Sequence, residues 1–286
     1  MTSSEIRHVA IAGAGTMGNG IAHIFSSKEY EVTLLDTTDE MLCKGIDTIR
    51  ANLARQVRKG TMTEECVTQT LGRIHPTTDK KAVSRVQLVI EAIYEDLDLK
   101  THFWSEVDKL CPPEVIFASN TSSLPITQIA AATSRKEQFI GMHFMNPVPM
   151  MKLVEVIRGM ATDDETCETV KELAIKLDKT PVEVNDSPGF VANRILMPMI
   201  NEAIFALMEG VSTKEEIDTV MRLGANHPMG PLTLADFIGL DVCLAIMETL
   251  YNGYCDSKYR PCPLLRKMVQ SGWLGRKTGK GFYDYP

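Results

Sequence analysis

The chain has 286 residues, of which 44% are hydrophobic and 23% are charged, a composition typical of a globular protein with an ordinary core. Its 30 Lys and Arg against 37 Asp and Glu give a formal net charge of −7, which argues against a nucleic-acid binder and a membrane-surface protein. No stretch reaches the roughly 18 apolar residues of a membrane-spanning helix, and the length predicts about two domains.

The cysteines and the first residues bear on location and on metal binding. The seven cysteines are widely spread and form no CxxC pair, so we expect neither a zinc site nor a disulfide framework. No secretory signal is recognisable, because a short apolar run leads directly into glycines. Scattered thiols suit a reducing compartment, and we therefore expect a cytoplasmic protein.

The first half of the chain alternates short apolar runs with longer amphipathic stretches. Most of the runs are continuously apolar, which is typical of parallel strands that are buried on both faces. The predicted strands span residues 6–12, 31–35, 87–92, 115–119, 138–142 and 152–157. The predicted helices between them span residues 18–27, 39–59 and 97–109. This alternation predicts an α/β fold with a doubly wound, parallel sheet of the Rossmann type.

The pattern changes at the Asp-Ser-Pro-Gly turn of residues 186–189, after which the sequence is almost wholly helical. The predicted helices span residues 190–209, 233–252 and 263–271. Ser212 with Glu215 predicts a capping box for a further helix between the first two. The glycine-rich residues 272–285 are expected at the surface. We therefore predict two domains, residues 1–185 with the sheet and residues 186–286 as an all-helical domain.

A glycine-rich loop follows the first predicted strand and opens the first predicted helix. The loop contains Gly13, Gly15, Thr16, Met17 and Gly18. Its GxGxxG spacing allows a backbone to approach a pyrophosphate, whose charge is favoured at a helix N-terminus. Asp36 lies 18 residues beyond the last glycine, at the end of the second strand, where it can bind an adenosine ribose and repel a 2′-phosphate. The sequence therefore predicts an NAD site, with NAD favoured over NADP.

Two polar segments follow later strands, at the sheet edge where α/β proteins bind ligands. Residues 119–123 are small hydroxyls and amides, which by themselves indicate a turn with a helix cap. His143 opens the second segment and is the side chain best suited to proton transfer near neutral pH. Glu155, in the next strand, is either the partner of this imidazole or a solvated carboxylate. A base held by a carboxylate is the arrangement expected of an alcohol dehydrogenase that transfers hydride.

Residues 44–59 reverse the charge of the chain. They contain five basic residues and one acidic residue, which gives +4. Arg55 and Lys59 are four residues apart and share one face of the predicted helix. Such a run is usually a solvated face, and the alternative is a site for the phosphates of an anionic substrate.

At these residues the sequence resembles the L-3-hydroxyacyl-CoA dehydrogenase family, and most of all the short bacterial 3-hydroxybutyryl-CoA dehydrogenases. The resemblance covers essentially the whole chain, in six blocks that occur in order. The blocks are GAGTMGNGIA at 13–22, FASNTSSLPIT at 117–127, HFMNPVPMMKLVEVI at 143–157, DSPGFVANRIL at 186–196, GANHPMGPLTLADFIGLD at 224–241 and GRKTGKGFYDY at the end.

The resemblance implies an enzyme that moves a hydride between NAD(H) and C3 of a short-chain (S)-3-hydroxyacyl-CoA, such as 3-hydroxybutyryl-CoA. By that resemblance His143 is the general base, Glu155 orients it, Ser122 binds the reacting oxygen and Asn193 binds the substrate near its thioester. The implied cofactor contacts are the glycine loop, Asp36, Glu95, Lys100, Asn146 and Lys277. Arg55 and Lys59 are candidates for the CoA phosphates, and the helical domain is expected to bind substrate and to form a homodimer.

Two other functions stay open from the sequence. The same fold and base could act on another 3-hydroxy acid, 3-hydroxyadipyl-CoA or a gulonate-type sugar acid. A cation near the substrate would favour a second carboxylate, and only Arg194 and Arg222 are close in sequence to the expected substrate residues. A non-catalytic sensor of the dinucleotide is the third possibility. The joint presence of four residues argues against it, namely His143, Glu155, Ser122 and Asn193.

Overall fold

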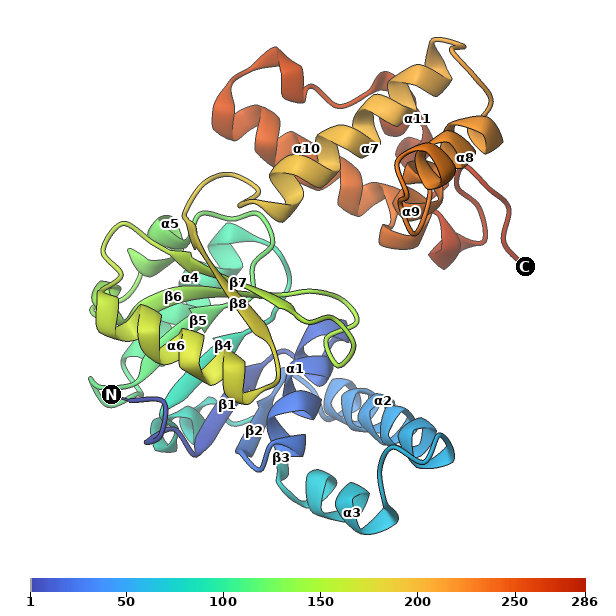
Figure 1. Cartoon of the computed structure of the whole chain (residues 1–286). Helices are drawn as coiled ribbons and strands as arrows, with labels where there is room; N and C mark the ends of the chain where they lie inside the picture. Colours follow the sequence, from blue (N-terminus) through green and yellow to red (C-terminus); the bar gives the residue numbers. More distant parts are fainter. Residues whose placement is uncertain (1) are drawn as a thin grey trace. The chain divides into compact units, whose positions relative to one another are not determined.

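The computed structural model describes residues 2–286 and divides the chain into two compact units (Figure 1). The first unit ends at Asp186 and contains the sheet, and the second unit spans Ser187–Pro286 and is helical. The division falls within the Asp-Ser-Pro-Gly turn. No helix of residues 2–286 is long and apolar enough to cross a membrane.

Eight strands form one sheet in the first unit, in the order β3-β2-β1-β4-β5-β6-β7-β8. The strands are β1 (His8–Ala12), β2 (Glu31–Leu35), β3 (Ile74–Thr77), β4 (Leu88–Glu91), β5 (Ile116–Ser119), β6 (Phe139–Phe144), β7 (Leu153–Arg158) and β8 (Thr180–Asn185). Neighbouring strands are parallel except for β6 and β7, which are antiparallel. The order reverses between β1 and β4, which is the switch point where such sheets bind ligands. The predicted doubly wound Rossmann-type sheet is therefore confirmed.

The two edge strands, β3 and β8, were not predicted. In β3 only Ile74 is buried, and in β8 only Val184 is buried, so neither strand carries a continuous apolar run. Each also contains a proline, Pro76 or Pro181, a residue that counts against a central strand but is tolerated at a sheet edge. Edge strands have one free side and need less hydrophobic surface, so their sequence signal is weak.

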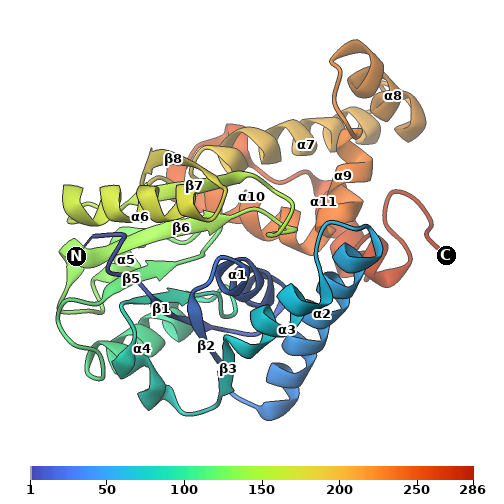
Figure 2. The same ribbon diagram turned by 60° about the horizontal axis from the view of Figure 1, so that its bottom comes forward.

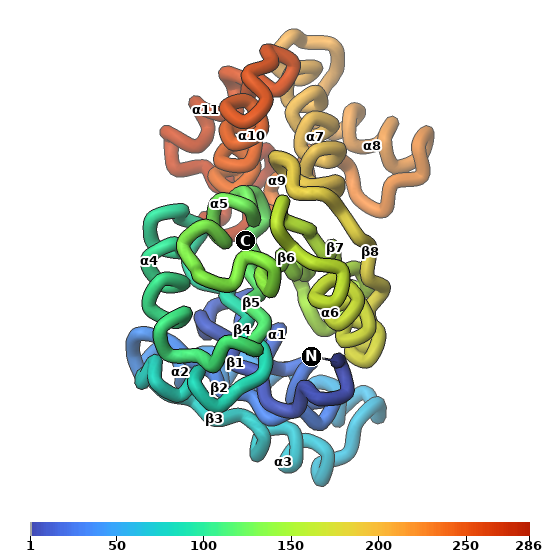
Figure 3. Tube along the Cα trace, turned by 90° about the vertical axis from the view of Figure 1, so that its left-hand side faces the viewer, coloured from blue at the N-terminus to red at the C-terminus, as the bar shows by residue number. Residues whose placement is uncertain are grey.

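Helices cover both faces of this sheet. They are α1 (Thr16–Ser27), α2 (Asp39–Arg58), α3 (Glu64–Gly72), α4 (Leu97–Asp108), α5 (Ile126–Ala130) and α6 (Asp164–Lys176), with short 3-10 turns at Lys80–Arg85 and Lys136–Gln138. Figure 2 shows α1, α2 and α3 gathered together beside β1–β3, and Figure 3 shows α4 and α6 on opposite sides of the sheet. Trp104 of α4 packs on Phe117 and Phe139, with ring centroids 4.7 and 4.9 Å away. Ile140 points to the other face and joins the core that contains Val170 of α6.

Five helices and the C-terminal segment form the second unit, which confirms the predicted helical domain but has one helix more than the four that were predicted. The helices are α7 (Ala192–Met208), α8 (Lys214–Gly224), α9 (Pro231–Ile238), α10 (Leu240–Tyr254) and α11 (Pro263–Gln270), with 3-10 turns at Ser257–Tyr259 and Arg276–Thr278. They share one apolar core, in which Ile204, Leu232 and Leu250 are fully buried. The C-terminal segment is fixed to this core, because the Asp236 carboxylate accepts hydrogen bonds from the backbone N–H groups of Phe282 and Tyr283, both at 2.9 Å.

Two details of the second unit correct the sequence predictions. The single helix predicted over residues 233–252 is wrong, because Gly239 has φ +106° and separates α9 from α10. The predicted capping box of Ser212 and Glu215 is also wrong by one residue. Thr213 caps α8 and Glu216 completes the box, because the Thr213 side chain accepts from the Glu216 N–H at 3.3 Å while Glu216 accepts from the Thr213 N–H at 3.3 Å.

Candidate active site

The glycine loop joins β1 to α1, and its three glycines do different things. Gly13 has φ +99°, and a Cβ there would lie 2.5 Å from the Ala92 carbonyl oxygen. A Cβ on Gly18 would lie 1.7 Å from the carbonyl oxygen of Gly13. Both positions therefore require glycine for packing. A Cβ on Gly15 would meet nothing within 4 Å, so this glycine leaves open space beside the backbone, as a ligand that approaches the loop needs.

A pocket of about 600 Å³ opens beside this loop, at the carboxyl ends of β1, β2 and β4. Its lining includes Gly15, Asp36 and Ile93, one from each of the segments that follow these strands. Helix α1 begins here at Thr16 with no side-chain cap and no acidic residue in its first turn. Its first N–H groups and its dipole therefore suit an anion such as a pyrophosphate.

Asp36 closes the pocket at the end of β2. Its carboxylate accepts hydrogen bonds from the backbone N–H groups of Ala14 and Thr37, both at 2.6 Å. The side chain thus supports the glycine loop and places a negative charge in the pocket. An open glycine, an uncapped helix N-terminus and an acidic side chain after the second strand are the features by which this type of fold binds NAD. The residues of this pocket fit NAD.

His143 and Glu155 are brought together by the antiparallel pairing of β6 and β7. The register of these strands places the two residues directly opposite each other, so that their side chains share one face of the sheet. His143 Nδ1 and Glu155 Oε2 are 2.7 Å apart. The two residues are 5% and 2% exposed, so Glu155 is a buried partner of the imidazole and not a solvated carboxylate. The hydrogen bond to Nδ1 fixes the orientation of the imidazole ring.

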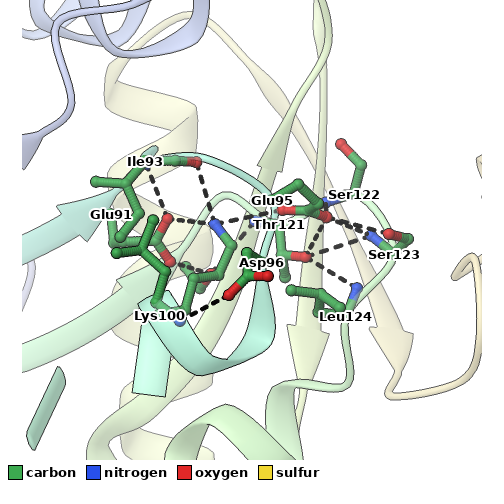
Figure 4. A network of polar contacts seen from close by, with 11 residues as sticks. Glu91, Ile93, Glu95, Asp96, Lys100, Thr121, Ser122, Ser123 and Leu124 are labelled. Atoms are coloured by element: carbon green, nitrogen blue, oxygen red, sulfur yellow. Dashed lines mark hydrogen bonds and ion pairs between the residues drawn. The ribbon is translucent and has the colours of Figure 1, made fainter. Parts of the chain in front are cut away.

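Residues 119–124, which we call the serine loop, begin at the last residue of β5 and are held by carboxylates (Figure 4). Glu95 accepts hydrogen bonds from the N–H of Ser122 at 2.9 Å, the N–H of Ser123 at 3.1 Å and the hydroxyl of Thr121 at 2.6 Å. Burial by itself raises the pKa of Glu95. Lys100 and these hydrogen-bond donors lower it by more than burial raises it, so the pKa lies below its usual value. Glu95 is therefore ionised and fixes the loop that carries Ser122.

Lys100 lies in the first turns of α4 and is 1% exposed. Its ammonium pairs with Glu91, and it lies 3.3 Å from Glu95 and 3.4 Å from the carbonyl oxygen of Ile93. Glu91 is the last residue of β4 and is fully buried, and sequence analysis missed it. A carboxylate at the end of an otherwise apolar strand was the available signal, because a buried acid is retained only where it has partners.

Asn120 lies in the polar segment that the sequence analysis singled out, where it was given no role of its own, and it links the serine loop to β6. Its side-chain oxygen accepts from the N–H of Phe144 at 2.9 Å, and its own N–H donates to the carbonyl oxygen of Glu91 at 2.8 Å. Because β4, β5 and β6 are parallel, their carboxyl ends meet at one edge of the sheet. His143 and the serine loop therefore lie at the same edge as the glycine loop.

Asn146 lies in the exposed loop that follows β6. A buried lysine, Lys179, holds this loop by donating to the carbonyl oxygens of Val148 at 2.6 Å and Met151 at 2.7 Å. Burial and the neighbouring Lys152 lower the pKa of Lys179. Lys179 thus anchors the loop next to His143, and the sequence analysis, which named Asn146, did not identify this lysine.

The other predicted residues lie apart from this cluster or in the second unit. Arg55 and Lys59 are exposed at the end of α2, where Arg55 donates to the side-chain oxygen of Asn52 at 2.7 Å. Asn193 is buried on α7, and Lys277 lies 2.6 Å from the carboxylate of Asp241. Asn193 and Lys277 belong to the second unit, and their roles stay predictions.

Comparison with known proteins gives matches over the whole chain. Residues 8–187 match the family model of the 3-hydroxyacyl-CoA dehydrogenase NAD binding domain, and residues 189–285 match the 3-hydroxyacyl-CoA dehydrogenase C-terminal domain. The chain is 56% identical over 281 residues to the probable 3-hydroxybutyryl-CoA dehydrogenase of Bacillus subtilis (strain 168), which covers 98% of each chain. It is 55% identical over 283 residues to the 3-hydroxybutyryl-CoA dehydrogenase of Bradyrhizobium diazoefficiens, covering 99% of this chain and 97% of that one. The crystal structure of (S)-3-hydroxybutyryl-CoA dehydrogenase from Ralstonia eutropha matches with a TM-score of 0.96 and 50% identity, covering 99% of this chain and 100% of that one.

Proposed function

The chain belongs to the NAD-binding 3-hydroxyacyl-CoA dehydrogenase family, and from this premise we propose that it interconverts (S)-3-hydroxybutyryl-CoA and acetoacetyl-CoA. The observation that carries the proposal is the buried His143–Glu155 pair at the edge of the sheet where the glycine loop also lies. The names of the relatives at 55 and 56% identity support the short acyl chain. A base at this edge suits an alcohol that is oxidised beside a dinucleotide.

His143 is proposed to take the proton of the 3-hydroxyl group through Nε2, because Nδ1 is engaged by Glu155. Bound NAD⁺ supplies the acceptor for the hydride that leaves C3. A positive charge develops on the imidazole as the proton arrives, and the Glu155 carboxylate, 2.7 Å away and 2% exposed, stabilises that charge where water does not screen it. In the reducing direction the protonated His143 returns the proton to the carbonyl oxygen of the 3-oxoacyl group.

The remaining polar residues are proposed to bind and orient the substrate and the cofactor. The Ser122 hydroxyl donates to the reacting oxygen, and Glu95 fixes the backbone that carries it. Asn193 binds the substrate near its thioester. Asn146, Lys277 and the Glu95–Lys100 pair contact the cofactor, while Arg55 and Lys59 supply cations for the CoA phosphates.

A homodimer that forms through the second unit is part of the proposal. Ile195 on α7 and Val220 and Leu223 on α8 are 68%, 64% and 78% exposed, although all three are large and apolar. Exposed apolar side chains of this size are typical of a protein–protein interface. Leu223→Glu is expected to convert a dimer to a monomer in light scattering, and a wild-type protein that is monomeric at every concentration would contradict this part. A cytoplasmic location stays a prediction.

The substrate is tested by NADH oxidation with a panel of 3-oxo compounds. We expect acetoacetyl-CoA to give the highest kcat/KM, ahead of longer 3-oxoacyl-CoA esters and of 3-oxoadipyl-CoA. A preference for 3-oxoadipyl-CoA would point to a dicarboxylic substrate. Gulonate is tested in the opposite direction, and NAD⁺ reduction with gulonate but no activity with the CoA esters would point to a sugar acid. Binding of NADH without turnover of any substrate would indicate a sensor.

A further inference from the structure

We propose that Glu91 is a positioning residue, which sets the place of Ser122 through the alternating charges Glu91, Lys100 and Glu95. The proposal rests on the proposed role of Ser122 at the reacting oxygen. Glu91 takes no part in the proton transfer described above. It lies at the end of β4, and Figure 4 shows it at one end of the polar network, with Ser122 and Ser123 at the other.

Glu91 is fully buried, and burial raises the pKa of its carboxyl group, while Lys100, Ser119 and the N–H of Ile93 act in the opposite direction by favouring the charged form. Its carboxylate pairs with the ammonium of Lys100, accepts from the hydroxyl of Ser119 at 2.7 Å and accepts from the N–H of Ile93 at 2.9 Å. Ser119 is itself fully buried and is the first residue of the serine loop. Glu91 therefore holds the start of the loop directly, because a buried carboxylate keeps only geometries that satisfy its oxygens.

Lys100 carries the effect from Glu91 to the middle of the loop. Its ammonium is shared between two carboxylates, Glu91 on one side and Glu95 at 3.3 Å on the other. Glu95 in turn accepts from the N–H groups of Ser122 and Ser123. The ammonium is 1% exposed, so water cannot replace either carboxylate. The position of Lys100 between its partners thus decides how Glu95 faces the loop.

Removing the charge of Glu91 changes this balance. In Glu91→Gln the buried ammonium of Lys100 keeps one carboxylate, and it is drawn toward Glu95. Glu95 then turns from the N–H groups of Ser122 and Ser123 toward the lysine, and these amides lose their acceptor. A reacting group displaced by about 1 Å lowers the rate by on the order of 100-fold even where the fold is kept.

The test compares Glu91→Gln with Asp108→Asn. Asp108 lies at the other end of α4, and its carboxylate pairs with the buried Arg135 at 2.7 Å. Asp108→Asn therefore also removes a carboxylate that pairs with a buried cation. We expect both variants to lower Tm. Only Glu91→Gln is expected to lower kcat with acetoacetyl-CoA, by about 10- to 100-fold, with the KM for NADH changed less than threefold. A kcat of Glu91→Gln within twofold of Asp108→Asn would overturn the proposal.

Amide hydrogen exchange of residues 119–124 gives a second measurement that does not need turnover. Glu91→Gln is expected to speed exchange at Ser122 and Ser123 by at least tenfold while residues 139–144 keep the wild-type rate; wild-type exchange at both serines would overturn the proposal. If Glu91→Gln does not fold, Ser119→Ala removes one link between Glu91 and the loop and is judged by the same exchange and kcat criteria. A wild-type protein that does not reduce acetoacetyl-CoA would contradict the proposed function. Hydrogen exchange would still test whether Glu91, Lys100 and Glu95 hold the serine loop in place.

Discussion

Glu155→Gln is expected to slow the reaction without weakening the binding of either substrate. The glutamate contacts His143 and is proposed to stabilise the positive charge that the ring carries during proton transfer. Gln keeps the size of the side chain and an oxygen that can accept from Nδ1, so the ring keeps its orientation. What is lost is the negative charge, in a pair of residues 5% and 2% exposed.

The magnitude follows from the 2.7 Å contact between His143 Nδ1 and Glu155 Oε2. A hydrogen bond to a charged group contributes about 1.5 to 3 kcal/mol, and each ~1.4 kcal/mol in the barrier changes the rate tenfold. We therefore expect kcat to fall about 10- to 150-fold in Glu155→Gln. KM for acetoacetyl-CoA and NADH is expected to change little, because the lost interaction is made in the transition state.

The assay is steady-state NADH oxidation with acetoacetyl-CoA for Glu155→Gln, His143→Ala and the double variant. Glu155 acts through His143, so adding Glu155→Gln to His143→Ala is expected to have almost no further effect on kcat. Glu183→Gln is the control, because Glu183 lies on the neighbouring strand β8, pairs with Lys171 and is half-exposed. Fully additive losses, or a raised KM with an unchanged kcat, would refute the proposal that the Glu155 carboxylate acts through the charge on His143.

Gly15→Ala is expected to raise the KM for NADH at least about tenfold with an unchanged Tm, because its Cβ meets only open space where the cofactor approaches. In contrast, Gly18→Ala is expected to lower stability by about 1 to 3 kcal/mol, because its Cβ would lie 1.7 Å from a carbonyl oxygen; equal Tm values for the two variants would contradict this. Asp36→Ala is expected to bring the ratio of kcat/KM for NADH to that for NADPH closer to one. An unchanged ratio would show that Asp36 does not distinguish the adenosine ribose from its 2′-phosphate. Burial lowers the pKa of His23 from 6.5 to about 4, so the unfolded chain takes up a proton at this residue more readily than the folded protein does. The contribution of the neutral His23 to the free energy of unfolding is therefore complete above pH 6.5 and is lost as the pH falls toward 4. Urea unfolding should show a loss of about 2 kcal/mol from this residue between pH 7 and pH 5, which His23→Leu removes and whose persistence in that variant would exclude His23 as its source.

The sequence was informative where local chemistry alone determines the structure. The glycine spacing at residues 13–18 requires close backbone packing, and the distances around Gly13 and Gly18 show why no other residue fits. The continuous apolar runs identified the inner strands, since these are buried on both faces. His143 could be singled out because it ends such a run. The edge strands β3 and β8 carry no such run.

What depended on tertiary register could not be read in advance. The sequence left Glu155 open between a buried partner and a solvated carboxylate, because spacing does not say whether β6 and β7 are parallel or antiparallel. The antiparallel register decided it by placing Glu155 opposite His143. Glu91 and Lys100 are nine residues apart and meet only because α4 folds back on the end of β4. From the sequence, Gly239 is a single glycine that a helix can tolerate, so one continuous helix was predicted. Its positive φ in the structure shows that the helix ends there.

The most direct test of the central claim is the rate of NADH oxidation with acetoacetyl-CoA, measured for the wild type and His143→Ala, with NADPH in parallel. We expect rapid turnover by the wild type with NADH, little turnover with NADPH, and a loss of at least about 100-fold in kcat for a His143→Ala variant that still binds NADH. A His143→Ala variant that reduces acetoacetyl-CoA at the wild-type rate would contradict the claim that this buried histidine is the base.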